Sequence, residues 1–289
     1  MKRRKIKVDI LYCGDDNIED GLILSVLSLL KNVKEPLHIF VLTIYFCAGE
    51  KVYYPISGAF ADTLDKIVKE VNLDNFVFLT DITEVFSAEV PKANLDTRFT
   101  PCCMLRLFAD KIPGLPEKIL YLDNDVICRK DCSDFFHQDI SEYEYAGALD
   151  YYGRWFFRKN LLKADYQNSG VLLMNMGMIR ESGLLQKCRK LCTEKRMFMP
   201  DQSALNKLAV SKKIVPRRFN EQHRVQRDTV LQHFTTGFRF FPWFHTVTVK
   251  PWEAEKLHSE LGMYEYDKLL HTYRRLCPII KEGLPGGCS

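Results

Sequence analysis

Residues 119–125 read Ile119-Leu120-Tyr121-Leu122-Asp123-Asn124-Asp125, a short apolar run closed by two aspartates. Such a run is typical of a buried, parallel strand whose C-terminal end reaches the surface. Side chains at positions i and i+2 of an extended segment point to the same face, so Asp123 and Asp125 would repel each other without a cation between them. Magnesium and manganese prefer hard oxygen ligands and usually join one or two carboxylates to substrate phosphates. The stretch therefore predicts a metal that bridges the protein to a phosphorylated substrate.

Strand-like and helix-like segments alternate along the first two thirds of the chain. The predicted strands are residues 6–13, 37–44, 76–79, 119–122, 145–149 and 171–175, and the predicted helices are residues 18–30, 60–71, 104–110 and 178–193. This alternation predicts an α/β fold in which helices flank a mostly parallel sheet. Because ligands bind at the carboxyl ends of the strands in such sheets, we expect residues 13–17 and 123–125 on one edge.

Composition and charge narrow the class of protein. The 289 residues suffice for one large domain, and a net charge of +4 argues against a dedicated nucleic-acid binder. The ten cysteines form no pair of CxxC motifs at zinc spacing, so we expect reduced core thiols. No apolar core follows the basic residues 1–5, and no run of about 18 apolar residues occurs, so a cytoplasmic location is expected.

The C-terminal part differs in character from the rest. Residues 217–244 are rich in aromatic side chains, and residues 252–276 are amphipathic. One helical face of the amphipathic segment carries Tyr266, Leu269, Leu270, Tyr273 and Leu276. We expect this face to pack against the sheet or to cover the site. The alternative is peripheral contact with the inner face of the membrane, helped by the basic N-terminus and residues 274–275.

Three further segments carry polar side chains where a substrate could bind. Residues 14–17, Gly-Asp-Asp-Asn, lack the GxGxxG pattern of a dinucleotide cradle but could bind ribose hydroxyls and a base edge. Residues 167–175 place amides beside an apolar strand. Residues 200–206 begin with Pro-Asp, which fits either a helix N-cap or a site residue.

Taken in order, six segments resemble the family-8 glycosyltransferases, the retaining group that includes bacterial lipopolysaccharide galactosyl- and glucosyltransferases and glycogenin. The segments are Asp-Asp-Asn at 15–17, Arg-Leu at 106–107, KILYLDNDVICRKD at 118–131, NSGVLLMNM at 168–176, DQSALN at 201–206, and His233 with Lys250-Pro251-Trp252. The resemblance implies a GT-A-type nucleotide-binding domain over residues 1–252 and a mainly helical extension over residues 253–289. It also implies UDP-glucose or UDP-galactose as donor, with Mn²⁺ or Mg²⁺.

The resemblance also implies roles for single residues. The implied metal ligands are Asp123, Asp125 and His233. The implied contacts to the nucleotide are Asp15, Asn17, Arg106, Asn124 and Lys250. The implied sugar pocket and reaction centre consist of Asp150, Asn168, Asp201 and Gln202, the last two being the best candidates for contact with the reacting sugar. Judged by residue type alone, Arg106 could instead form a surface ion pair and His233 could be structural.

One segment departs from the family pattern. Residues 238–249 form an aromatic insertion between His233 and Lys250, so the motif alone does not fix the position of Lys250 relative to a diphosphate. The insertion could provide a platform on which an acceptor sugar stacks, or it could add to the core.

The expected function is retaining transfer of a hexose from a UDP-sugar to a glycan or glycolipid, as in synthesis of lipopolysaccharide or another bacterial cell-surface glycan. Front-face attack is preferred, because no carboxylate nucleophile stands out and Gln202 is a poor one. Two alternatives remain open at this point. One is a nucleotide-sugar binder without turnover, and the other is an Asp-x-Asp phosphoryl hydrolase, which the residue at Ile127 disfavours because those enzymes carry Thr there.

Overall fold

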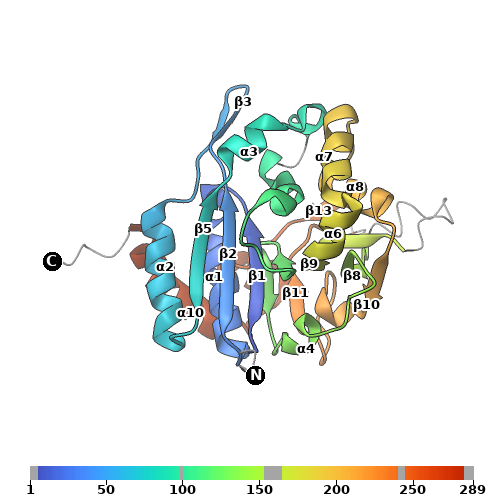
Figure 1. Cartoon of the computed structure of the whole chain (residues 1–289). Helices are drawn as coiled ribbons and strands as arrows, with labels where there is room; N and C mark the ends of the chain where they lie inside the picture. Colours follow the sequence, from blue (N-terminus) through green and yellow to red (C-terminus); the bar gives the residue numbers. More distant parts are fainter. Residues whose placement is uncertain (1–5, 98–99, 153–164, 240–244, 283–289) are drawn as a thin grey trace, which may run out of the picture.

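A seven-stranded sheet forms the centre of the computed structural model, which describes residues 6–97, 100–152, 165–239 and 245–282 (Figure 1). The strand order is β10-β8-β9-β6-β1-β2-β5. The bounds are β1 Val8–Cys13, β2 Leu37–Thr43, β5 Phe76–Asp81, β6 Lys118–Leu122, β8 Tyr145–Leu149, β9 Gln167–Asn175 and β10 Lys212–Val215. Only β9 runs antiparallel to its neighbours, so the predicted mostly parallel sheet is confirmed.

Two hydrophobic cores lie on the two faces of the sheet. Ile10 and Tyr12 pack against the face covered by α1, α2 and α10, whereas Leu11 points to the opposite face, because side chains alternate along a strand. The helices of the first face are α1 Glu19–Asn32, α2 Gly58–Val71 and α10 Asp267–Glu282. The elements of the second face are α3 Thr83–Ala88, the 3-10 helix η3 Pro101–Lys111, α6 Met176–Ser182, α7 Leu184–Glu194 and α8 Pro200–Leu208.

Among the described residues, three two-stranded sheets lie outside the central one. They are β3 Phe46–Ala48 with β4 Lys51–Tyr53, β7 Val126–Cys128 with β11 Leu231–His233, and β12 Gly237–Arg239 with β13 His245–Val247. The remaining short helices are η1 Asp16–Ile18, η2 Lys92–Asn94, α4 Ser133–Phe136, η5 Arg217–Phe219 and α9 Ala254–Leu261. The pair β7–β11 matters most for function, because β7 directly follows residues 123–125.

Two predicted helices differ in form from the sequence-based expectation. The predicted helix 178–193 is two helices, α6 and α7, separated at Gly183, whose φ of 66° is left-handed and ends the first helix. The predicted helix 104–110 is the longer 3-10 helix η3. In both cases the apolar periodicity was read correctly, but periodicity does not show where a helix breaks or how tightly it is wound.

The C-terminal amphipathic face packs inside the molecule. Tyr266, Leu269 and Leu270 are buried in the first core, where α10 contacts α1 and α2. Packing is therefore confirmed for these residues, and they do not form a stripe that could face lipid. Residues 1–5 of the proposed membrane contact lie outside the described residues. No helix within the described ranges is long and apolar enough to cross a membrane.

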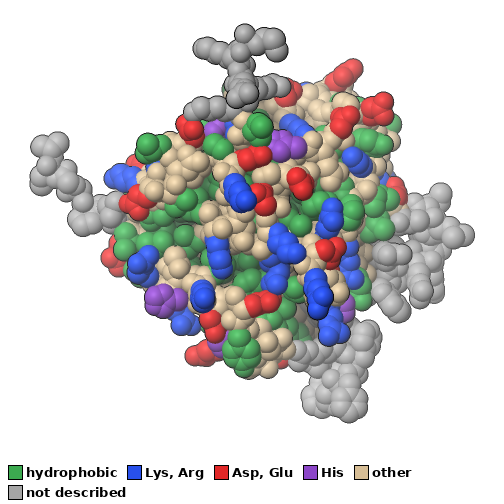
Figure 2. All heavy atoms as spheres, turned by 90° about the horizontal axis from the view of Figure 1, so that it is seen from below, with side chains coloured by type: hydrophobic (Ala, Val, Ile, Leu, Met, Phe, Trp, Pro, Cys, Tyr) green, Lys and Arg blue, Asp and Glu red, His purple; other side chains and the backbone are tan. Residues whose placement is uncertain are grey.

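The distribution of charges on one face and the state of the cysteines can be compared with the expectations from composition. Figure 2 shows the end of the molecule at the amino termini of the parallel strands, where Lys and Arg side chains are interspersed with Asp and Glu. The nine cysteines within the described ranges are free thiols, but the expectation that they lie in the core holds for five of them and is wrong for Cys47, which is exposed. The division at residues 252 and 253 stays a prediction.

Candidate active site

The predicted metal ligands meet at the carboxyl edge of the sheet. Asp123 and Asp125 lie in the turn between β6 and β7, and His233 ends β11. The antiparallel register of β7 and β11 pairs His233 with Val126, the residue after Asp125. One potential ligand atom from each of the three side chains lies within 4.8 Å of the others. Strand pairing thus brings together residues that are more than a hundred positions apart in the sequence.

The donor set suits a divalent cation. The Nε2 atom of His233 lies 3.1 Å from Oδ1 of Asp125 and 3.5 Å from Oδ2 of Asp123. Asp125 Oδ1 is buried, and when Nε2 of His233 carries no proton, Oδ1 accepts no hydrogen bond from the described residues. A buried carboxylate oxygen without a hydrogen-bond donor is costly unless a cation satisfies it. Two carboxylates and one imidazole are ligands that Mn²⁺ accepts, so the residues present fit the metal that the resemblance implies.

Hydrogen bonds behind His233 fix which ring nitrogen faces the carboxylates. Asn168 Oδ1 accepts from the backbone N–H of Gly170 at 3.0 Å and from Asn220 Nδ2 at 2.9 Å. Because a backbone N–H can only donate, the Asn168 atom that lies 3.2 Å from His233 Nδ1 is an oxygen, and Nδ1 carries the proton. The Nε2 atom therefore faces Asp123 and Asp125. This is the arrangement found in metal-binding histidines, whose second nitrogen donates to a neighbouring group.

Gly170 on β9 leaves the room that this arrangement needs. A Cβ atom at this position would lie 2.1 Å from Cε1 of His233 and 2.7 Å from Oδ2 of Asp123. The Gly170 carbonyl also accepts a hydrogen bond of 2.8 Å from the backbone N–H of Asp123. The glycine therefore brings the backbone of β9 into direct contact with two of the three candidate ligands.

Arg106 binds Oδ1 of Asp123, the carboxylate oxygen that does not face His233. Its Nη2 lies 2.8 Å from Asp123 Oδ1, which also accepts from the Tyr121 hydroxyl at 2.6 Å. Its Nη1 donates to the Ser169 carbonyl at 2.6 Å, and its Nε lies 3.3 Å from Asp201 Oδ2. Burial lowers the pKa of Arg106, but Asp123, Tyr121 and Asp201 raise it further, so the guanidinium stays charged. Burial also raises the pKa of Asp201, with Arg106 opposing.

Lys250 reaches the same site despite the insertion. The strands β12 and β13 pair as a hairpin, which returns the chain so that Lys250 Nζ lies 2.6 Å from Asp125 Oδ2. Residues 240–244, the aromatic centre of the insertion, lie outside the described residues, so the acceptor platform stays a prediction. Burial raises the pKa of Asp125, but Lys250 and His233 lower it more strongly, and the carboxylate is ionised.

The four residues predicted for the sugar pocket also come together. Gln202 Nε2 donates to Asp150 Oδ2 at 2.7 Å, and Gln202 Oε1 accepts from the backbone N–H of Ser169 at 2.9 Å. The Ser169 hydroxyl lies 3.3 Å from Asp201 Oδ2. Asn168 precedes Ser169 on β9 and is buried like the other three. Because β9 runs antiparallel, its first residues lie at the carboxyl ends of the parallel strands, next to the start of α8.

The turn after β1 lies at the same carboxyl edge of the sheet, because β1 pairs in parallel with β6. Asp15 is buried, and its Oδ2 accepts from Asn17 Nδ2 at 2.9 Å. The backbone N–H of Asp16 donates to the Tyr54 carbonyl at 2.9 Å, which ties the turn to the chain leaving β4. Contacts of Asp15 and Asn17 with a nucleoside stay predictions.

The side chain of Asn124 lies against α1, away from the cluster formed by the neighbouring Asp123 and Asp125. A Cβ atom on Gly21 of α1 would lie 2.5 Å from Asn124 Nδ2 and 2.7 Å from Cζ3 of Trp252. The Asn124 amide therefore packs against α1. Its predicted contact with the nucleotide is not tested by this arrangement.

Several residues of the site were missed from the sequence. Tyr121 could have been found, since it lies two positions before Asp123 and shares its face of the strand. Ser169 and Gly170 lie inside a segment that was noted, but their roles depend on the close approach of β9. Asn220 carried no signal, because it follows η5 and reaches Asn168 only through the fold.

The comparisons with known proteins agree with this geometry. Residues 9–256 match the family described as glycosyl transferase family 8. Glycosyltransferase GlyA of Streptococcus pneumoniae is 33% identical over 94 residues, which are 32% of this chain but only 13% of GlyA. Lipopolysaccharide 1,3-galactosyltransferase of Salmonella typhimurium is 22% identical over 268 residues, with 86% of this chain and 74% of that protein covered.

Solved structures share the fold. An active-site mutant of LgtC matches with a TM-score of 0.63 at 16% identity, covering 97% of this chain and 98% of that one. The bifunctional glycosyltransferase WbbM matches with a TM-score of 0.67 at 12% identity, covering 94% of this chain and 52% of WbbM. This chain thus spans about half of WbbM and a small part of GlyA. Since the family match covers most of the sequence and the sheet has the GT-A-type fold of the solved structures, the chain belongs to glycosyl transferase family 8.

Proposed function

We propose that this glycosyltransferase moves glucose or galactose from a UDP-sugar to a glycan or glycolipid, with retention and with Mn²⁺ or Mg²⁺. The observation that carries the proposal is the convergence of Asp123, Asp125 and His233 around one point at the carboxyl edge of the sheet. Galactosyl- and glucosyltransferases of lipopolysaccharide among the relatives support a hexose donor.

The metal would be held by these three side chains. When bound, it supplies positive charge that stabilises the negative charge developing on the departing diphosphate. Asn168 would keep Nε2 of His233 directed at the metal, and Arg106 would hold Asp123 in place from the opposite side. The ligands are thus oriented before substrate arrives, which is the condition for electrostatic stabilisation of a transition state.

Donor binding is assigned to the two sides of the metal site. Asp15 and Asn17 would bind the nucleoside, and Lys250 would contact the diphosphate. Asp201 and Gln202 would bind hydroxyls of the sugar, at the start of α8. Gln202 is already fixed at both ends of its amide, by Asp150 and by the backbone of Ser169, so its position is well defined.

The chemistry of these residues favours front-face attack by the acceptor hydroxyl. A covalent intermediate requires a free carboxylate beside the anomeric carbon. Gln202 is an amide and a poor nucleophile. Asp201 lies against the Arg106 guanidinium and Asp150 accepts from Gln202, so neither carboxylate is free of strong partners.

The test is release of UDP from a panel of nucleotide sugars, measured without acceptor in Mn²⁺, Mg²⁺ or EDTA. We expect metal-dependent release from one UDP-hexose, and loss of that release in His233→Gln. His258→Gln is the matched control, because His258 pairs with Asp267 on the surface. Binding of UDP with Mn²⁺ but no release, even with added acceptors, would favour the binder without turnover. Absence of UDP binding in the presence of Mn²⁺ would refute the proposal.

A further inference from the structure

The strand that ends in His233 is also held from its other side. Gln232 and His233 are consecutive on β11, so their side chains point to opposite sides of the strand. Gln232 is buried, and a buried amide needs hydrogen-bond partners. The Tyr266 hydroxyl donates to Gln232 Oε1, and Gln232 Nε2 contacts Met263 Sδ at 3.7 Å. Both partners belong to the C-terminal extension, between α9 and α10.

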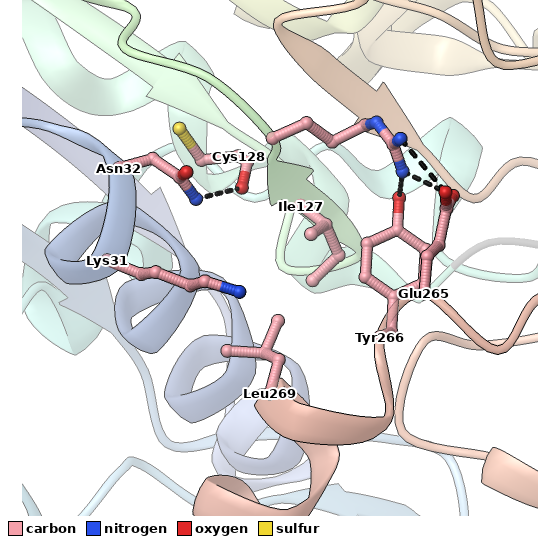
Figure 3. Close-up of a pocket in the computed structure, with 8 residues that line it drawn as sticks. Lys31, Asn32, Ile127, Cys128, Glu265, Tyr266 and Leu269 are labelled. Atoms are coloured by element: carbon pink, nitrogen blue, oxygen red, sulfur yellow. Dashed lines mark hydrogen bonds and ion pairs between the residues drawn. The ribbon is translucent and has the colours of Figure 1, made fainter.

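The same tyrosine also contacts the strand that follows Asp125. Arg129, directly after β7, donates from Nη1 to the Tyr266 hydroxyl. Its two terminal nitrogens also bind the carboxylate of Glu265, at 2.5 Å and 3.1 Å. In Figure 3, Glu265 and Tyr266 extend from the C-terminal extension toward these contacts, with Ile127 of β7 beside them. Tyr266 therefore connects β7 and β11. The first of these strands follows Asp125, and the second ends in His233.

A partly open cavity lies beside Tyr266. It has a volume of about 120 Å³ and is lined by Ile127, Tyr266 and Leu269, among others. The ring of Tyr266 packs against Phe234, the residue after His233, with 6.0 Å between the ring centroids. The Tyr266 hydroxyl adds a directional hydrogen bond to this packing at the end of β11.

We propose that Tyr266 is a positioning residue for the metal site: its hydroxyl holds Gln232 and thereby sets the place of His233. The proposal rests on the metal-dependent function proposed above. It also gives the C-terminal extension a role in the site itself, although none of its described residues is among the candidate metal ligands.

The test compares two tyrosine variants by their affinity for Mn²⁺ alone, measured by electron paramagnetic resonance without nucleotide. Tyr266→Phe removes the hydroxyl and keeps the ring. Tyr273→Phe is the matched control on the following helix α10, because its hydroxyl bonds to Asp20 on α1 and not to β11. We expect Tyr266→Phe to weaken Mn²⁺ binding about three- to tenfold, which is less than the roughly 10–100-fold for a direct partner of a ligand, because Tyr266 acts through Gln232. Tyr273→Phe should bind Mn²⁺ like the wild type.

A second variant tests the route through Gln232. Gln232→Leu should weaken Mn²⁺ binding by a similar factor, and adding Tyr266→Phe to it should have little further effect, because both changes break one contact. Melting temperatures show whether each variant is folded. If Tyr266→Phe does not fold, the Mn²⁺ affinity of Gln232→Leu serves as the test instead.

The outcomes separate this inference from the proposed function. Wild-type affinity in Tyr266→Phe, or equal losses in both tyrosine variants, would overturn the positioning role and leave the metal site standing. A wild-type protein that binds no Mn²⁺ would overturn the metal assignment, and this inference with it.

Discussion

Replacing Gly170 with alanine should remove the metal site while leaving the fold intact. The backbone of Gly170 is not in the left-handed region, so alanine meets no conformational barrier there. The obstacle is the added methyl group, which would lie 2.1 Å from Cε1 of His233. The substitution therefore tests the geometry of the site without changing any polar side chain.

The expected losses of Mn²⁺ affinity and of stability in Gly170→Ala can be estimated from the distance to His233 and from the usual cost of overpacking. Carbon atoms in contact are normally about 3.5–4.0 Å apart, so the imidazole must retreat by roughly 1.5 Å. Metal–ligand distances tolerate only about 0.2 Å, so we expect His233 to be lost as a ligand and Mn²⁺ affinity to fall by about 100-fold or more. Overpacking costs about 1–3 kcal/mol, which the reduced entropy of the unfolded chain offsets by up to about 1 kcal/mol. A domain with about 5–15 kcal/mol of stability survives that loss.

The assay is Mn²⁺ titration by electron paramagnetic resonance, together with thermal unfolding and UDP release. Gly177→Ala is the matched control. A Cβ there would lie 3.0 Å from Glu117 Oε2, whose side chain is exposed and can move, and at an ordinary contact distance of 3.4 Å from Asn175 Oδ1. We expect Gly177→Ala to bind Mn²⁺ like the wild type. A Gly170→Ala protein that keeps its Mn²⁺ affinity within about threefold would refute the argument, since a second-sphere loss alone is larger.

Two further predictions concern the charges around the site. Burial lowers the pKa of His233, but Asp125 and Asp123 raise it further, so the net pKa lies above its usual value. Because Mn²⁺ needs Nε2 without a proton, affinity should rise with pH through that pKa, by up to about tenfold per pH unit, and His233→Gln should flatten the profile. Lys250→Ala should tighten binding of Mn²⁺ alone by about threefold or more, because a cation 2.6 Å from Asp125 is removed, yet weaken UDP binding by about 1.5–3 kcal/mol. Calorimetric titrations with Mn²⁺ and with UDP check both signs, and weaker Mn²⁺ binding in Lys250→Ala would contradict the charge argument.

The sheet was largely predictable because its strands are short apolar runs. Residues 119–122 and 37–44 were placed correctly, since an apolar run bounded by polar residues has few alternatives to a buried strand. The break at Gly183 was not predicted, because the apolar pattern continues from α6 into α7 and one glycine does not by itself mark a helix end.

The site was predictable only in part, because some of its contacts depend on topology. The shared face of Asp123 and Asp125 follows from the period of a strand. The pairing of Arg106 with Asp123 could not be predicted from the sequence in this way. It arises where η3 meets the end of β6 and the start of β9. The alternative of a surface ion pair for Arg106 is wrong, because the guanidinium is buried against Tyr121, and its predicted contact with the nucleotide stays a prediction. Likewise, the sequence did not fix the position of Lys250, because an insertion precedes it. In the structure β12 pairs with β13, and Lys250 lies beside Asp125.

The charges explain why metal and nucleotide should bind together under the proposed function. Asp125 now contacts two positive groups, the ammonium of Lys250 and the imidazole of His233, whose raised pKa favours its protonated form. A divalent ion bound by Nε2 of His233 and by Asp125 would take the place of one proton, and the ammonium of Lys250 would stay nearby with its charge. The buried site would therefore gain one positive charge, which is costly unless an anion compensates it. A diphosphate is the anion that can satisfy the divalent ion and Lys250 at once.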